Sequence, residues 1–162
     1  MPQLRYITIL FFAYAFNAQA EPLTFVAQQI NANKLSSLSS ETRTLLKKEM
    51  RALNAGLKEM ISAYIQGDWK KIGVISQKMH NSYLFKQQLT TEQKKELKQK
   101  LPLAFIKRDQ AFHRQAFLLE KVSKSLNQKI IYREMSTLTQ ACLACHQIYA
   151  TTRFPNLIKS TQ

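Results

Sequence analysis

The chain has 162 residues, of which 45% are hydrophobic, and it carries a formal net charge of +14. This length allows one hydrophobic core and leaves little room for a second, so residues 21–162 are expected to form a single domain. Only three glycines and four prolines occur, which disfavours a fold with many turns and favours a few long helices.

The first twenty residues have the features of a secretory signal peptide. Arg5 gives a positive start, and an apolar run of about ten residues follows it. Ala18 and Ala20 place small residues at the expected cleavage positions. An uncleaved membrane anchor is the alternative, but the run is shorter than the ~20 residues that a membrane-spanning helix needs. We therefore expect cleavage after Ala20 and a periplasmic protein that consists of residues 21–162.

Two helices are predicted in the first half of the mature chain. The first is expected to begin near Ser40, and its apolar residues recur every three or four positions. They are Leu46, Met50, Leu53, Leu57, Met60, Ile61 and Tyr64. Gly67 can end this helix and Asp68 can cap the next one, which is expected from about Trp69 to Leu84.

The second half predicts a short basic helix and two further long helices. Residues 90–93 resemble a capping box, and the short helix they open should stop before Pro102. The apolar face of the third long helix comprises Phe105, Phe112, Ala116, Leu119, Val122 and Leu126. Asn127 separates it from a fourth, whose stripe comprises Ile131, Met135, Leu138, Cys142, Cys145 and Tyr149. No segment alternates like a strand, so we expect an all-α, antiparallel up-down-up-down four-helix bundle.

The only two cysteines form a C-x-x-C-H motif, the attachment signature of a c-type haem. On a helix, Cys142, Cys145 and His146 share one face, so all three can point at the same flat ring. The motif predicts one covalent haem c, held by thioether bonds from both sulfurs, with His146 as the proximal iron ligand.

Three other interpretations of the motif remain open. The cysteines could form a thioredoxin-type dithiol, although such pairs usually open a helix rather than lie late in one. They could bind a structural zinc, which would have to recruit His80 or His113. The pattern could also occur by chance in a protein without haem.

The region from about Leu45 to Tyr149 resembles the class II c-type cytochromes, the cytochrome c′ family, in its four predicted helices and its C-x-x-C-H motif. The resemblance implies a bundle with covalent haem on the last helix. It also places Met50 over the distal face of the haem. In low-spin members of the family a methionine nearby binds the iron, whereas in high-spin members the distal residue only covers a five-coordinate iron. One departure is Ala150, where many members carry a basic residue; Arg153 follows three residues later.

The predicted helix ends also rank the distal candidates. His146 is expected about six residues before the end of the fourth helix, and counting 1.5 Å per residue places four candidates in the same half of the bundle. They are Met50, Met79, His80 and His113. Met60 and Met135 fall toward the other end and are expected in the core. Met50 is the preferred ligand, with packing over an open iron as its alternative.

The excess of basic residues indicates which kinds of partner the protein could bind. It is densest at residues 94–100 and at Lys107 and Arg108, which could dock an acidic redox partner or an anionic membrane surface, or could simply be solvated. No nucleic-acid recognition motif occurs, and no group of residues indicates an enzyme. The leading function is periplasmic electron transfer. The alternatives are a five-coordinate protein that binds nitric oxide or carbon monoxide and a haem-free basic helical interaction protein. The oligomeric state stays open, with a homodimer among the alternatives.

Overall fold

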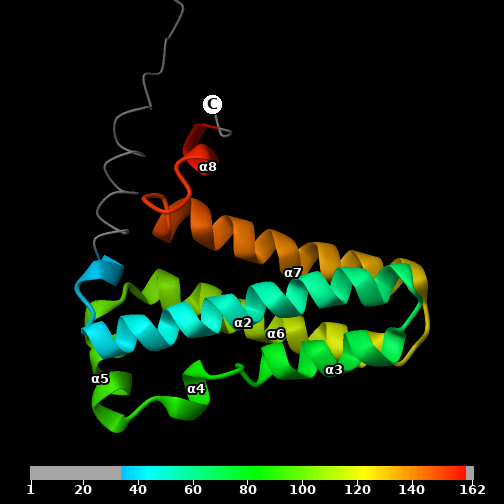
Figure 1. Cartoon of the computed structure of the whole chain (residues 1–162), viewed down its shortest axis with the longest axis horizontal. Coiled ribbons are helices and arrows are strands. Elements are labelled where there is room, and N and C mark those ends of the chain that lie inside the picture. Colours follow the sequence, from blue (N-terminus) through cyan, green and yellow to red (C-terminus); the bar gives the residue numbers. More distant parts are fainter. Residues whose placement is uncertain (1–33, 160–162) are drawn as a thin grey trace, which may run out of the picture.

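The structure is a computed structural model that describes residues 34–159, and every regular element within that range is a helix. The predicted signal peptide lies outside the described residues. Figure 1 labels the helices, of which four are long: α2 (Ser40–Ile65), α3 (Trp69–His80), α6 (Leu103–Ser123) and α7 (Gln128–Tyr149). The shorter ones are α4 (Phe85–Gln88), α5 (Thr91–Lys100) and α8 (Asn156–Lys159). The all-α prediction is confirmed for these residues, and the long helices lie side by side as a helical bundle (Figure 1).

Most helix starts are fixed by the local residues that the sequence indicated. The Asp68 side chain accepts a hydrogen bond from the Lys71 amide and caps α3. Gly67 precedes it with a φ of 70°, a conformation that glycine adopts without strain. Thr90 and Gln93 form the predicted capping box at the start of α5. These side chains satisfy amides that a helix leaves unpaired in its first turn.

Three predicted helix ends are wrong, those of α3 and α7 and also that of α6, which stops at Ser123 before Leu126. The second helix stops at His80 rather than near Leu84, because the buried Glu49 carboxylate of α2 accepts hydrogen bonds from the amides of Tyr83, Leu84 and Phe85 at 2.6–3.0 Å. The last helix stops at Tyr149, so His146 lies three residues from its end instead of six. A turn follows it, and the chain re-forms only the short helix α8.

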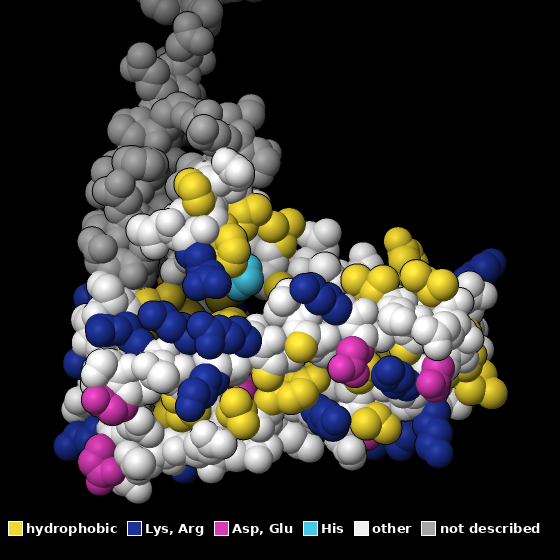
Figure 2. Space-filling model, viewed as in Figure 1, with side chains coloured by type: hydrophobic (Ala, Val, Ile, Leu, Met, Phe, Trp, Pro, Cys, Tyr) yellow, Lys and Arg dark blue, Asp and Glu magenta, His cyan; other side chains and the backbone are white. Residues whose placement is uncertain are grey.

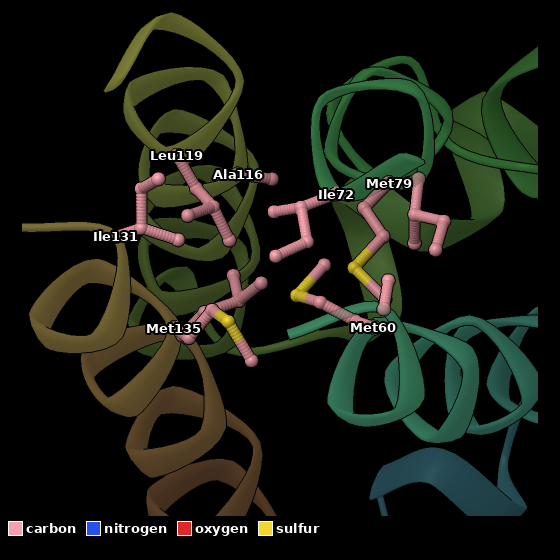
Figure 3. Close-up of a cluster of buried hydrophobic side chains, with 10 residues drawn as sticks. Met60, Ile72, Met79, Ala116, Leu119, Ile131 and Met135 are labelled. Carbon is pink, nitrogen blue, oxygen red and sulfur yellow. The ribbon is translucent and has the colours of Figure 1, made fainter. Parts of the chain in front are cut away.

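The main core takes side chains from all four long helices (Figure 3). Met60 of α2 is fully buried and Met135 of α7 is 7% exposed, which confirms both as core residues. The other members are Ala63, Ile72, Ile75, Met79, Ala116, Leu119, Ile131 and Leu138. Leu126, expected on the same face as Leu119, is instead 68% exposed because α6 ends before it.

Helix α2 has two inward faces rather than one. Its fully buried stripe contains small and polar residues, among them Glu49, Gly56 and Ala63. The predicted apolar stripe lies beside it and, apart from the buried Met60, is half-buried or exposed. Its half-buried residues are Leu46, Leu53, Leu57 and Tyr64, and its exposed ones are Met50 and Ile61. Helix α2 packs against α3, and α7 packs against α6, whereas α2 and α7 scarcely contact each other. The apolar stripe of α2 is therefore incompletely covered.

Helix α5 is tied to the start of α2 by one carboxylate. Glu96 accepts hydrogen bonds from the amide and hydroxyl of Ser39 at 2.6 and 2.9 Å, from the Thr42 hydroxyl at 2.7 Å and from the Lys100 ammonium at 2.9 Å. Thr42 and Lys100 contribute most to lowering the pKa of Glu96 to about 2.

Among residues 34–159, no helix combines the length and the apolar character needed to cross a membrane.

Candidate functional site

The C-x-x-C-H residues lie on the last turns of α7, on the stripe that the sequence predicted. Leu138 on this stripe is fully buried, whereas Cys142 and Cys145, one and two turns later, are half-buried. Tyr149 at the end of the stripe is buried again and packs edge-on against Phe105 of α6, with ring centroids 5.0 Å apart. The two thiols thus lie where the buried face of α7 becomes partly accessible.

Both cysteines are free thiols. The Cys142 thiol donates a weak hydrogen bond to the Leu138 carbonyl, with a sulfur–oxygen distance of 3.6 Å. Burial raises the pKa of Cys142 and raises that of Cys145 to about 11. The thiols are therefore protonated near neutral pH. A thioredoxin-type dithiol needs a lowered thiol pKa, so this environment disfavours that interpretation.

The imidazole of His146 is half-buried and stacked on Phe154, with ring centroids 4.9 Å apart and planes 25° from parallel. Burial is the main cause that lowers the pKa of His146, and the nearby charge of Arg153 adds to it. The neutral imidazole that results is the form that binds metals. The Arg153 guanidinium also lies 5.7 Å from the centre of the Phe154 ring. Helical spacing in the sequence could not relate Phe154 to His146, because the helix ends between them.

Helix α2 lies across from the face of α7 that carries the motif. The distance between α2 and α7 increases toward the cysteine end of α7. At the other end of the bundle, Tyr64 of α2 and Tyr132 of α7 are in contact, with ring centroids 5.8 Å apart. Two turns before Leu57 on helix α2, Met50 is 41% exposed. Figure 1 shows α7 rising away from α2 toward α8, and Figure 2 shows a recess between them in which hydrophobic side chains are visible.

Met50 lies on the side of α2 that faces α7. Met50, Leu57 and Tyr64 follow one another at intervals of seven residues, or almost two full turns, so they share one face. Because Tyr64 contacts Tyr132 of α7, that face is directed toward α7. Met50 is therefore on the face of α2 that is turned toward α7, the helix that carries the motif.

The two other histidines are held in the seam between α3 and α6. The His113 ring donates from Nδ1 to the Met79 carbonyl at 2.8 Å, and its Nε2 lies 3.4 Å from the Asp109 carboxylate. The His80 Nδ1 lies 3.1 Å from the His113 carbonyl. His80 also packs against Phe117, with ring centroids 5.0 Å apart. Within the described range no three His, Cys, Asp or Glu side chains are grouped to hold a metal ion, so the zinc interpretation finds no ligand set here.

No protein-family model matches this chain, and the searches of curated proteins and of solved structures return no match.

Proposed function

We propose that the protein is a periplasmic electron carrier of the class II c-type cytochrome kind, an antiparallel four-helix bundle with one covalent haem c. The observation that carries the proposal is the position of the C-x-x-C-H motif. All three of its reactive side chains lie on the partly accessible part of the core stripe of α7, where α7 and α2 separate. Cofactors of helical bundles bind in such positions, between facing helices.

The donor set fits this cofactor. Cys142 and Cys145 are free, and each would form a carbon–sulfur bond to a vinyl-derived carbon of the porphyrin. Of the three motif residues only His146 would bind the iron, so attachment does not require the cysteines and the histidine to surround a common metal position. When bound, the haem supplies an iron that alternates between the ferrous and ferric states.

The chain's own side chains would limit access of water and fix the proximal imidazole. Leu53 and Leu57 of α2 add half-buried apolar surface beside the main core, and Leu138 of α7 is fully buried within that core. Phe154 stacks on His146 and restricts rotation of its ring. Restricting the ligand and lowering the local dielectric are two ways in which a protein tunes a redox centre.

Met50 is the candidate for the distal position. If α2 and α7 run antiparallel, the Tyr64–Tyr132 contact fixes their relative level. Met50 precedes Tyr64 by fourteen residues and His146 follows Tyr132 by fourteen, so both lie about 21 Å from that contact. We infer that Met50 would be level with His146 and that its thioether would supply a second ligand to the iron.

Haem attachment is tested by mass. The full chain, signal peptide included, is expressed in a host equipped to attach c-type haem, and the mature protein is weighed after acid-acetone extraction. We expect the mass of the polypeptide plus one haem, and the bare polypeptide for the double variant Cys142→Ala/Cys145→Ala. Leu143→Ser, which changes an exposed side chain between the two cysteines, should retain the haem. A colourless wild-type protein of bare polypeptide mass would refute the proposal and favour a haem-free interaction protein.

A further inference from the structure

One end of the bundle exposes large aliphatic side chains at two neighbouring turns. The turn between α2 and α3 and the turn between α6 and α7 both lie at this end (Figure 1). Ile65, the last residue of α2 before the first turn, is 78% exposed, and Leu126 in the second turn is 68% exposed. Ile61 and Tyr132, 51% and 59% exposed, extend the apolar surface along α2 and α7. These four residues are called the turn-end patch below.

Folding alone does not account for the leucine at position 126. Its φ is 56°, in the left-handed region that glycine and asparagine adopt more readily than a bulky aliphatic residue. Its side chain gains little from burial, because it is mostly in solvent. The position therefore combines an unfavourable backbone conformation with an unfavourable exposed surface, and a binding role would account for both.

Lysines surround the turn-end patch. Lys70 lies in the first turn of α3, Lys124 lies between α6 and α7, and Lys129 lies in the first turn of α7, all exposed together with Lys71. The nearest acidic residue in the first of these turns, Asp68, uses its carboxylate to cap the Lys71 amide. Figure 2 shows hydrophobic and basic side chains at this end of the molecule, with acidic side chains also among them.

We propose that the turn-end patch docks the protein onto an anionic lipid bilayer, with Ile65 and Leu126 inserted at the level of the headgroups and the lysines against lipid phosphates. Apolar side chains flanked by lysines are the combination that binds anionic membrane surfaces. The site is independent of the proposed haem.

The size and charge of this end favour lipid over protein. Four helix ends, each about 10 Å across, present roughly 400 Å². A stable protein interface needs about 800 Å² from each partner. A second copy of the chain would also bring its own lysines against these. A fluid anionic surface can instead adapt to a convex end and neutralise the charge.

The test measures co-sedimentation of the wild-type protein with vesicles of phosphatidylglycerol and with vesicles of phosphatidylcholine. We expect binding to the first, weakened by added salt, and little binding to the second. Ile65→Ser and Leu126→Asn should each weaken binding about tenfold, since each removes one buried aliphatic side chain. Leu126→Asn suits a left-handed backbone, so it should not lower the melting temperature. Leu103→Ser, which changes another leucine that is 68% exposed, should bind as the wild type does.

Matched lysine pairs test the electrostatic part. Lys70→Gln/Lys71→Gln should weaken binding more than tenfold, because each lysine near an anionic surface contributes about 1 kcal/mol. Lys94→Gln/Lys95→Gln removes the same charge from α5 and should have a much smaller effect. Equal losses from both pairs, or no binding to phosphatidylglycerol, would overturn the proposal. So would a dimer in solution that Ile65→Ser dissociates, since the patch would then be a protein interface.

Discussion

Met50 exposes 41% of its surface although it lies on the inward, α7-facing side of α2. An unpaired thioether there would leave apolar surface in water, whereas coordination to iron would cover it. We predict a low-spin optical spectrum for the haem-loaded protein, and we expect Met50→Ala to convert it to a high-spin spectrum. The reduction potential should fall at the same time, because an axial methionine raises it. Both are measured by spectroscopy and redox titration of the purified protein.

Leu46→Ala, a change one turn earlier on the same half-buried stripe, is the control for this prediction and should leave the low-spin bands in place. If the wild-type spectrum is high-spin and Met50→Ala does not alter it, Met50 is not a ligand. The iron would then be five-coordinate, which favours the binding of nitric oxide or carbon monoxide.

Single residues differ in how well the sequence predicts them. Cys142, Cys145 and His146 could be selected from the sequence because the spacing of the motif carries its own helical geometry. Phe154 could not, since its contact with His146 depends on the turn after α7. Glu49 could not either: a glutamate within an apolar helical pattern suggests solvent exposure, but amides from a distant turn bury it.

At the level of helices, α3 packs tightly against α6 at Gly73. A methyl group added at Gly73 would lie 2.6 Å from the hydroxyl oxygen of the buried Ser123. Glycine to alanine within a helix normally gains about 0.5–1 kcal/mol. Overpacking costs about 1–3 kcal/mol, so we predict that Gly73→Ala lowers the free energy of unfolding by about 1 kcal/mol.

A double-mutant cycle isolates this contact. With Ser123→Ala the hydroxyl is gone, and the next atom, the β-carbon of residue 123, lies 3.6 Å away, an ordinary contact. Gly73→Ala should therefore become neutral or stabilising in the Ser123→Ala background, as measured by urea unfolding. An equal effect of Gly73→Ala in both backgrounds would show that the α3–α6 approach does not depend on this pair.

The positions of the helices were predictable because their apolar periodicity and their caps are local properties. The predicted stripe Ile72, Ile75 and Met79 is buried, and the capping box at Thr90 is present. The end of α3 was not predictable, since it is set by a carboxylate more than thirty residues earlier in the chain. The incomplete burial of the apolar stripe of α2 could not be predicted from the sequence either, because it depends on how far α7 lies from α2.

For the molecule as a whole, burial is uneven along the bundle. Where α2 and α7 are in contact, Met60 and Leu138 are fully buried; toward the motif, Met50 and Cys142 are not. Local stability follows such differences in buried apolar contacts. We therefore predict that, in the haem-free variant Cys142→Ala/Cys145→Ala, amides of residues 141–149 exchange with solvent by local opening. Amides of residues 131–138 should exchange only on global unfolding.

Haem attachment should protect the motif end of α7 from hydrogen exchange. A covalently held apolar group between α2 and α7 would cover the incompletely buried apolar stripes of both helices. We expect hydrogen exchange, followed by mass spectrometry, to slow at least about tenfold over residues 141–149 relative to the haem-free variant, a local stabilisation of about 1.4 kcal/mol. Residues 72–79 of α3 lie in the closed half and are the internal control, where any change reflects global stability alone. Equal slowing in both segments would mean that the cofactor stabilises the bundle without covering the recess. Faster exchange at residues 131–138 than at residues 141–149 in the haem-free variant would contradict the burial gradient itself.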